Sequence, residues 1–241
     1  MDNMYTGTGV YSLPEASRLI GVQSREIRRW LYGYSYKRTV NGEPVRKFSA
    51  PLWTPQTSIK DPDEQVIGFH DLLEIRFVRE FVRHGVPLAV VRRCLGVARD
   101  MYQVDYPFTT LQFKTDGRTI FGEAIKASQD DGSLTDLRTR QLVFKEIISP
   151  SLYDGIEYDG RQARKWYPLG AKKKIVLDPG RQFGSPIVEE TGTPTSVLFA
   201  SFLAEGRDET AMQRTASSYA ISLPLVRAAV TFEQGLKRTV H

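Results

Sequence analysis

The chain has 241 residues, more than one average domain, and 41% of them are hydrophobic, which is ordinary for a protein with a substantial core. Its 33 basic and 28 acidic residues give a formal net charge of +5, which suits an anionic partner without being extreme. The single cysteine, the lack of an N-terminal apolar run before a small-residue cleavage site, and the lack of about eighteen unbroken apolar residues argue against disulfides, secretion and membrane insertion. We therefore expect two or three domains in a soluble, reduced, cytoplasmic protein with no membrane partner.

The stretch from Tyr11 to Leu31 predicts two short helices around a glycine turn, which is the sequence form of a helix-turn-helix. Gly21 makes the turn, Val22 fills the gap between the helices, and Ser24 is expected to cap the second helix. The apolar positions expected to face the domain are Ala16, Leu19, Ile20, Ile27, Trp30 and Leu31.

Arginines occupy the other side of the second helix, as a DNA recognition helix requires. In a recognition helix the apolar residues pack against the domain. The guanidinium groups on the other side can then reach phosphates or the acceptor edge of guanine in the major groove. A helical pair with a purely structural role is the alternative, because any surface helix has a polar face. The residues predicted to contact DNA here are Ser24, Arg25, Arg28, Arg29 and Tyr32.

A β-hairpin that serves as a wing is predicted after this helical pair. The segment from Lys37 to Gln65 is rich in Pro, Gly, Ser and Thr, and Asn41-Gly42 is the strongest two-residue turn signal in the chain. Its flanks would bring cations down to backbone phosphates beside the recognition helix. A plain surface loop is the alternative. The cations of the flanks are Lys37, Arg38, Arg46 and Lys47.

Two stronger helices are predicted next. The first runs from about Phe69 to His84 and ends at Gly85, and Pro87 at a first-turn position starts the second. The residues expected to be buried are Leu72, Leu73, Ile75, Phe77, Val78, Phe81 and Val82, followed by Leu88, Val91, Leu95 and Met101. The second helix would present Arg92, Arg93 and Arg99.

The order helix, turn, helix, wing, helix, helix is carried by three groups of residues: Tyr11-Ser12-Leu13-Pro14-Glu15-Ala16; Val22 to Leu31; and Phe69 to Arg76 with Gly85-Val86-Pro87-Leu88 and Val91-Arg92. On these residues the first hundred positions resemble the DNA-binding domain of the MerR-like winged helix-turn-helix regulators. We assign this domain to residues 1–105.

Residues 106–174 change character, with short alternating runs between turns, and we expect a β-rich connector there. Leu111 to Phe113 and Thr119 to Phe121 flank a turn at residues 115–118 and predict one hairpin. Ile156 to Tyr158 and Arg164 to Tyr167 flank Asp159-Gly160 and predict another. An exposed loop is expected at 129–133, and a buried strand or a turn of helix at 142–148.

Residues 175–241 predict a domain of three short helices. Thr195 or Ser196 would cap the first helix, Asp208 would cap the second, and Pro224 would lie in the first turn of the third. A domain this small buries only a modest core, so we expect it to pack on the β-rich segment or on a second subunit.

A second resemblance rests on this part of the chain. Its residues are Asp178-Pro179, Gly184-Ser185-Pro186-Ile187-Val188, Thr191 to Thr195, Ala204-Glu205-Gly206, Tyr219, and Val226 to Val230 with Phe232-Glu233. They resemble a short helical domain of antitoxins from bacterial toxin-antitoxin pairs, and the whole chain resembles a VapB-type antitoxin of the mycobacterial kind. The resemblance implies repression of its own operon and neutralisation of a VapC-type toxin, a ribonuclease of the PIN-domain class.

Cations in the last domain are the candidates for toxin binding. PIN-type sites gather carboxylates around a divalent metal, so an inhibitor can place an arginine in that acidic cleft or cover it. For each cation, a solvated surface charge is the alternative. The candidates are Arg207, Arg214, Arg227, Lys237 and Arg238.

No catalytic residue, metal site or cofactor is predicted. His70, His84 and His241 have no metal-ligand spacing, Cys94 lies on an apolar helical face as a core thiol, and no Walker loop, dinucleotide fingerprint or nucleophile elbow occurs. We do not expect an enzyme.

The predicted fold is mainly α with a small β-rich middle segment (α+β): a MerR-like winged helix-turn-helix, β-hairpins, and a C-terminal three-helix domain. Three functions stay open: an autoregulating antitoxin, a MerR-like transcription regulator with a ligand- or partner-sensing C-terminal half, and a nucleic-acid enzyme. The antitoxin is favoured, with operator DNA and the toxin as partners. A homodimer is expected, because a helix-turn-helix reads palindromes as a two-fold dimer.

Overall fold

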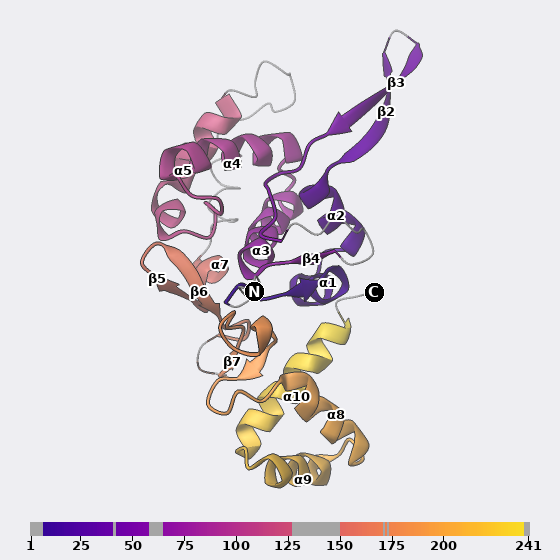
Figure 1. Cartoon of the computed structure of the whole chain (residues 1–241), viewed down its shortest axis with the longest axis vertical. Helices are drawn as coiled ribbons and strands as arrows, with labels where there is room; N and C mark the ends of the chain where they lie inside the picture. Colours follow the sequence, from indigo (N-terminus) through magenta and orange to yellow (C-terminus); the bar gives the residue numbers. More distant parts are fainter. Residues whose placement is uncertain are drawn as a thin grey trace, which may run out of the picture.

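The computed structural model describes residues 7–40, 42–57, 65–126, 150–170, 172 and 174–238. Helices dominate the described residues, and their strands pair in short two-stranded antiparallel sheets, so the predicted mainly α, α+β fold class is confirmed. Figure 1 shows an elongated molecule with a protruding β-hairpin at one end and a small group of helices at the other.

The predicted helix-turn-helix is confirmed. Strand β1 (Tyr11–Ser12) leads into α1 (Leu13–Ile20), whose first turn is closed by a reciprocal capping box between Ser12 and Glu15. Gly21 ends α1 with φ 72°, a left-handed conformation that glycine adopts without steric cost, and α2 (Ser24–Tyr32) follows. Ser24 is not the cap that we predicted: Gln23 holds that position, and Ser24 Oγ instead donates to the carbonyl of Leu13.

Helices α3 (Phe69–Arg83) and α4 (Leu88–Tyr102) form the centre of the main core, and β4 (Val66–Ile67) pairs with β1 beside them. The thiol of Cys94 is fully buried there, and burial raises its pKa, as befits a core thiol. The prediction of burial was wrong for two residues. Val82 is 38% exposed and Met101 is 54% exposed, because both lie beyond the edge of the buried face of their helix.

The hairpin predicted at residues 111–121 is wrong, because these residues belong to helix α5 (Leu111–Lys126). Asp116-Gly117 is a strong turn signal, yet Phe113, Ile120 and Phe121 recur at helical spacing and are buried. Phe113 packs against Phe108, and Phe121 packs against Phe81 of α3. Burial of these aromatic rings outweighs the local preference of the glycine for a turn.

The second predicted hairpin is confirmed. Strands β5 (Ile156–Asp159) and β6 (Gln162–Trp166) pair antiparallel after the short helix α7 (Pro150–Tyr153), and a register shift falls between Glu157 and Tyr158. Trp166 then exchanges backbone hydrogen bonds with Leu177, which ties the hairpin to the next segment. The predictions for residues 129–133 and 142–148 lie outside the described residues.

The C-terminal part has its own core. Strands β7 (Ile175–Val176) and β8 (Ile187–Val188) flank the 3-10 turn η4 (Gln182–Gly184), and α8 (Thr195–Ala204), α9 (Glu209–Tyr219) and α10 (Leu223–Arg238) complete it. The three predicted helices are confirmed, and Asp208 caps α9 as predicted. The predicted caps of α8 were wrong: Pro194 holds that position, and Thr195 is buried with its hydroxyl bonded to Glu233.

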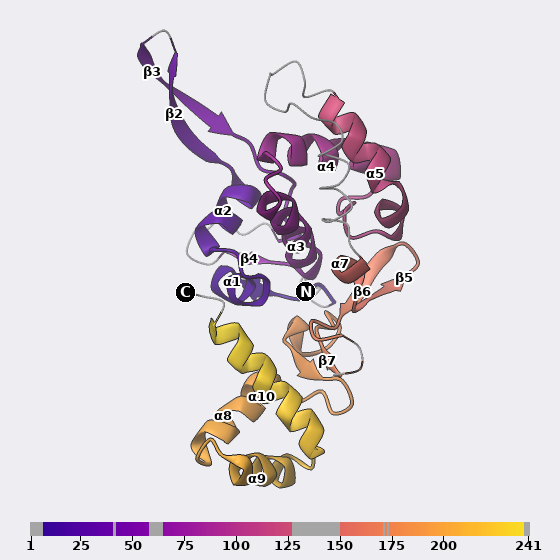
Figure 2. The ribbon, with the colours of Figure 1, turned by 180° about the vertical axis from the view of Figure 1, so that it is seen from behind.

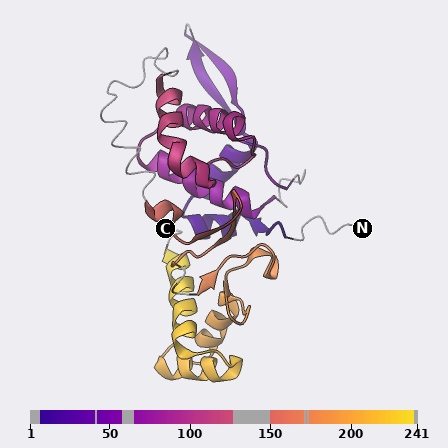
Figure 3. The ribbon, with the colours of Figure 1, turned by 90° about the vertical axis from the view of Figure 1, so that its left-hand side faces the viewer.

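The helical group is joined to the helix-turn-helix by direct contacts. The hydroxyl of Tyr11 donates to the carbonyl of Gly184 over 2.8 Å, and the amide of Val10 donates to the carbonyl of Phe183 over the same distance. Leu19 of α1 packs against both cores. Figures 2 and 3 show the C-terminal end of α10 reaching the body of the molecule beside α1. The two ends of the molecule therefore share one continuous framework.

One buried carboxyl group in this framework has an unusual protonation equilibrium. Glu74 of α3 is fully buried, and burial raises its pKa to about 8, although the amides of Phe108 and Thr109 donate to it and Arg99 is nearby. Its Oε2 has no hydrogen-bond partner among the described residues. The folded protein therefore holds a proton on Glu74 at pH values where the unfolded chain has lost it.

We predict that Glu74→Gln changes the pH dependence of stability. The folded pKa of Glu74 lies above the unfolded value. The free energy of unfolding of the wild type therefore falls as pH rises from about 4.5 towards 8, by about 1.4 kcal/mol per pH unit. Glutamine stays neutral, so urea unfolding should find the variant close to wild type at pH 4.5 and more stable by a few kcal/mol (order of magnitude) at pH 9. Parallel stability curves for the two proteins across this range would contradict the assignment.

Candidate functional site

Helix α2 presents its predicted DNA-contacting side chains as a recognition helix would. Ile27, Trp30 and Leu31 are buried against the core, which leaves Arg25 and Arg28 exposed on the opposite side. These apolar anchors fix the rotation of α2 about its axis, so the exposed guanidinium groups have a defined direction.

The C-terminal end of α2 is more constrained. Arg29 is half-buried, and its guanidinium lies 5.1 Å from the ring centroid of Tyr34. Tyr32 is half-buried too, and burial raises the pKa of its hydroxyl. A cation stacked on an aromatic ring loses rotational freedom but keeps its charge available. Arg29 therefore links α2 to the first strand of the hairpin that follows.

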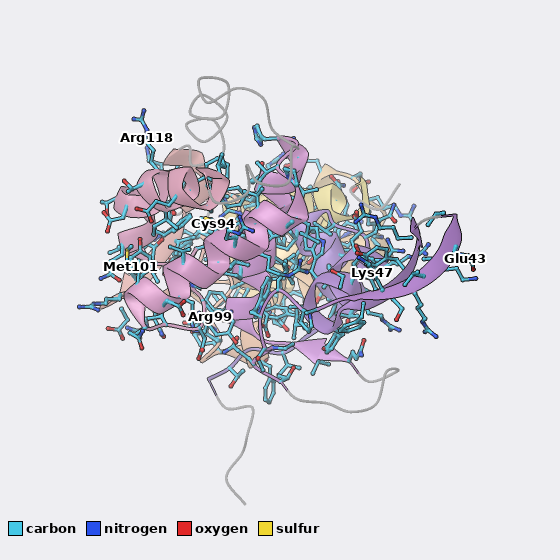
Figure 4. All side chains as sticks on the ribbon, turned by 90° about the horizontal axis from the view of Figure 1, so that it is seen from above. Glu43, Lys47, Cys94, Arg99, Met101 and Arg118 are labelled. Carbon is cyan, nitrogen blue, oxygen red and sulfur yellow. The ribbon has the colours of Figure 1, made fainter. Side chains whose placement is uncertain are left out.

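The predicted wing is present as a hairpin of two seven-residue strands, β2 (Tyr34–Val40) and β3 (Glu43–Ser49). Gly42 between them has φ 86°. The structure therefore favours the wing over the plain surface loop. Figures 1 and 4 show the hairpin projecting from the body beside α2, with Glu43 near its tip and Lys47 nearer its base.

The predicted cations occupy both faces of this hairpin. Lys37 lies opposite Arg46 in the register, and since directly opposed residues share a face, these two cations lie on one side. Arg38 opposes Val45 and Lys47 opposes Tyr36, which puts Arg38 and Lys47 on the other side. All four cations are exposed, and Glu43 is the single acidic residue in the two strands. The hairpin is therefore a cationic ribbon suited to phosphate contacts on either face.

The base of the hairpin is tied to the core through α4. Arg92 of α4 donates from Nη2 to Ser49 Oγ over 3.0 Å and to the carbonyl of Ala50 over 2.7 Å. The amide of Leu52 donates to the carbonyl of Trp30 in α2 over 2.7 Å. These bonds connect the end of β3 to both the recognition helix and the core.

Asp71 in the first turn of α3 has a positioning role that the sequence did not predict. Its carboxylate accepts from Trp53 Nε1 at 2.8 Å, from the amide of Gln56 at 2.9 Å and from the amide of Gly68 at 3.0 Å. Burial raises its pKa, while these hydrogen bonds oppose the rise. Asp71 thus clamps the segment returning from the hairpin onto α3. The signal was an acidic residue near the start of an otherwise apolar helix.

The cations predicted to contact a toxin differ in their surroundings. Arg214 forms an ion pair with Glu205 at 3.0 Å, and Arg227 pairs with Glu209 at 2.5 Å. Lys237 Nζ lies 4.6 Å from the ring centroid of Phe199. Arg207 is exposed at the corner between α8 and α9, and no ion pair or ring contact occupies its side chain among the described residues.

The side chain of Arg238 lies outside the described residues. The Glu209–Arg227 pair joins the first turn of α9 to α10, so it places Arg227 close to the corner that carries Arg207. Arg214 is bonded to Glu205 at the same corner, so the described structure brings three of the five predicted cations, Arg207, Arg214 and Arg227, towards one region of the helical group.

The described residues hold no group of three or more His, Cys, Asp or Glu side chains that could bind a metal ion. Among those same residues, no helix combines the length and apolar character that crossing a bilayer requires.

Comparisons with known proteins identify a helix-turn-helix domain near the start of the chain and relatives along most of its length. Residues 9–95 match the protein family described as "Putative DNA-binding HTH domain". Over 233 residues the chain is 26% identical to "Putative antitoxin VapB45" of Mycobacterium tuberculosis (strain ATCC 25618 / H37Rv), covering 92% of each chain. The crystal structure of Rv2018 from Mycobacterium tuberculosis has a similar fold, with a TM-score of 0.63 at 20% identity, covering 91% of this chain and 96% of that chain.

The chain therefore resembles a VapB-type antitoxin that carries an N-terminal helix-turn-helix domain, as the sequence predicted. The likeness to MerR regulators remains a prediction, and so do the domain boundaries at residues 105 and 174.

We predict that replacing Lys37 and Arg46 together by alanine weakens binding to duplex DNA of any sequence. Each phosphate contact that is lost removes about one unit from the slope of log affinity against log salt concentration, so the double variant should bind less tightly and lose about two units of slope. Fluorescence anisotropy over a series of salt concentrations measures both quantities.

The matched control is the Arg161→Ala/Arg164→Ala double variant, which removes two exposed arginines from the β5–β6 hairpin. It loses the same net charge and should retain the wild-type slope. Equal slopes for both double variants would show that net charge, rather than the β2–β3 hairpin, determines DNA affinity.

Proposed function

We propose that this protein is an antitoxin that neutralises a VapC-type ribonuclease of the PIN-domain class by direct binding and represses its own operon by binding operator DNA. The resemblance to a VapB antitoxin along most of the chain carries the proposal, because it includes the helical group as well as the helix-turn-helix. The protein itself is a binding protein without catalytic activity in this account.

The DNA-binding half has two elements with different tasks. Arg25 and Arg28 of α2 enter the major groove and contact base edges, while the cations of the β2–β3 hairpin contact phosphates. Ser24 acts indirectly, because its hydroxyl is bonded to the carbonyl of Leu13 and holds the start of α2. A two-fold homodimer would place two such units on half-sites about one helical turn apart.

The toxin-binding half presents cations to an acidic surface. Carboxylates that gather around a divalent metal create a cleft of strongly negative potential, and a guanidinium binds carboxylates with two parallel hydrogen bonds. Arg207 is the best placed of the predicted cations to enter such a cleft, since it projects from a corner and has no ion pair to break.

The backbone conformation of Arg207 allows this residue to be replaced by glycine. Arg207 has φ 66°, its amide donates to the carbonyl of Phe202, and glycine adopts this left-handed conformation more easily than arginine. Arg207→Gly therefore removes the guanidinium without demanding a new backbone. We predict that this variant folds with an unchanged or higher Tm but binds the toxin at least tenfold more weakly.

The experiment co-expresses the untagged chain with the protein encoded beside it, isolates the complex, and assays the ribonuclease activity of the partner with and without the antitoxin. Arg161→Ala is the matched control, because Arg161 is exposed at the turn between β5 and β6, outside the helical group that carries Arg207. Failure of the wild type to form a complex or to silence a ribonuclease overturns the proposed function. Full silencing by Arg207→Gly overturns only the role of Arg207.

A further inference from the structure

An apolar groove runs along the first half of α10. It has a volume of about 430 Å³ and lies between α10 and the segment around residues 169–172. Leu169, Leu223, Leu225 and Ala228 give it an apolar floor and walls, and Leu169 is 39% exposed although it is a large aliphatic side chain. The groove thus keeps aliphatic surface in contact with water, and a partner that covered it would gain the free energy of burying that surface.

Cations border this apolar surface. Lys172 and Arg227 both line the groove, and both are exposed. Lys172 belongs to the run Lys172-Lys173-Lys174 and has no ion pair with a described residue, whereas Arg227 is held by Glu209. An apolar groove bordered by lysine and arginine is complementary to an apolar side chain that has carboxylates around it.

One ion pair links the groove to the first turn of α9, which follows the corner that carries Arg207. Glu209 follows that corner by two residues and pairs with Arg227 on the groove wall. A partner that contacts both Arg207 and the groove would therefore pass over the Glu209–Arg227 pair.

We propose that this groove is the docking surface for the toxin, and that it takes apolar side chains from the rim of the toxin's acidic cleft. The proposal rests on the proposed function and deepens it by naming a second contact region. The buried apolar surface supplies affinity, and Lys172, which has no ion pair with a described residue, orients the acidic partner on the groove, while Arg227 stays paired with Glu209.

A second copy of this chain is a poorer occupant. In a two-fold contact of groove on groove, Lys172 and Arg227 of one protomer would lie near the same cations of its partner, and like charges placed together are unfavourable. Nucleic acid is a poorer occupant too, since the apolar part of the groove is aliphatic and offers no aromatic ring on which a base could stack.

The test introduces one negative charge into the groove of the full-length protein. Thr231 is exposed and lines the groove, so Thr231→Glu places a carboxylate where the toxin's own carboxylates would lie. The expected result is at least a tenfold rise in the Kd for the toxin, with DNA binding and Tm close to wild type. Lys172→Glu, a substitution outside α10, should also raise the Kd for the toxin.

Ala200→Glu is the matched control, because Ala200 is exposed on α8 and does not line the groove. It adds the same charge and should leave the Kd for the toxin within twofold of wild type. Equal weakening by Thr231→Glu and Ala200→Glu would overturn the proposal, since general charge repulsion would then explain the effect.

Two further outcomes separate this proposal from the proposed function. If the wild type silences the ribonuclease and Thr231→Glu does so with unchanged Kd, the groove proposal fails while the antitoxin function stands. If Thr231→Glu changes only the oligomeric state in light scattering, a second copy occupies the groove and the proposal is also overturned. If the wild type binds no ribonuclease, both fail together.

Discussion

The buried carboxylate of Asp71 is the interaction on which the arrangement of the DNA-binding half depends. It accepts hydrogen bonds from Trp53, Gln56 and Gly68, and so fixes the segment that returns from the β2–β3 hairpin against the start of α3. This clamp adds to the bonds of Arg92 with Ser49 and Ala50 and to the hydrogen bond from the amide of Leu52 to the carbonyl of Trp30, which hold the end of β3. Because buried donors without an acceptor cost about 1–3 kcal/mol each, the network also disfavours other positions of this segment. The hairpin and the recognition helix therefore act as one rigid unit.

The two candidate sites lie at opposite ends of an elongated molecule, as Figure 1 shows for the hairpin and α9. They are nevertheless joined mechanically, because Tyr11 bonds to Gly184 and Leu19 packs against both cores. Separation leaves room for DNA and a protein partner on the same chain. The shared framework means that a partner bound to the helical group meets the helix-turn-helix as part of the same body rather than through a loose linker.

Local signals in the sequence predicted the helix-turn-helix, the β2–β3 hairpin and the helices of the C-terminal part. They failed where distant contacts decide: α5 forms despite Asp116-Gly117, because Phe121 gains burial against Phe81 of α3, far away in the chain. Likewise, Ser24 bonds to Leu13 instead of capping its own helix. Ion pairs that join helices, such as Arg227 with Glu209, depend on packing that no spacing in the sequence reveals.

In the function that we propose, one chain holds operator DNA and a ribonuclease toxin at its two ends. The most direct measurement forms the complex of this protein with the protein encoded beside it, adds the DNA upstream of its own gene, and determines the mass of the assembly together with its ribonuclease activity. We expect a single assembly containing antitoxin, toxin and DNA in which the ribonuclease stays silent. Release of active ribonuclease when DNA binds, or an assembly that never contains both partners, would contradict it.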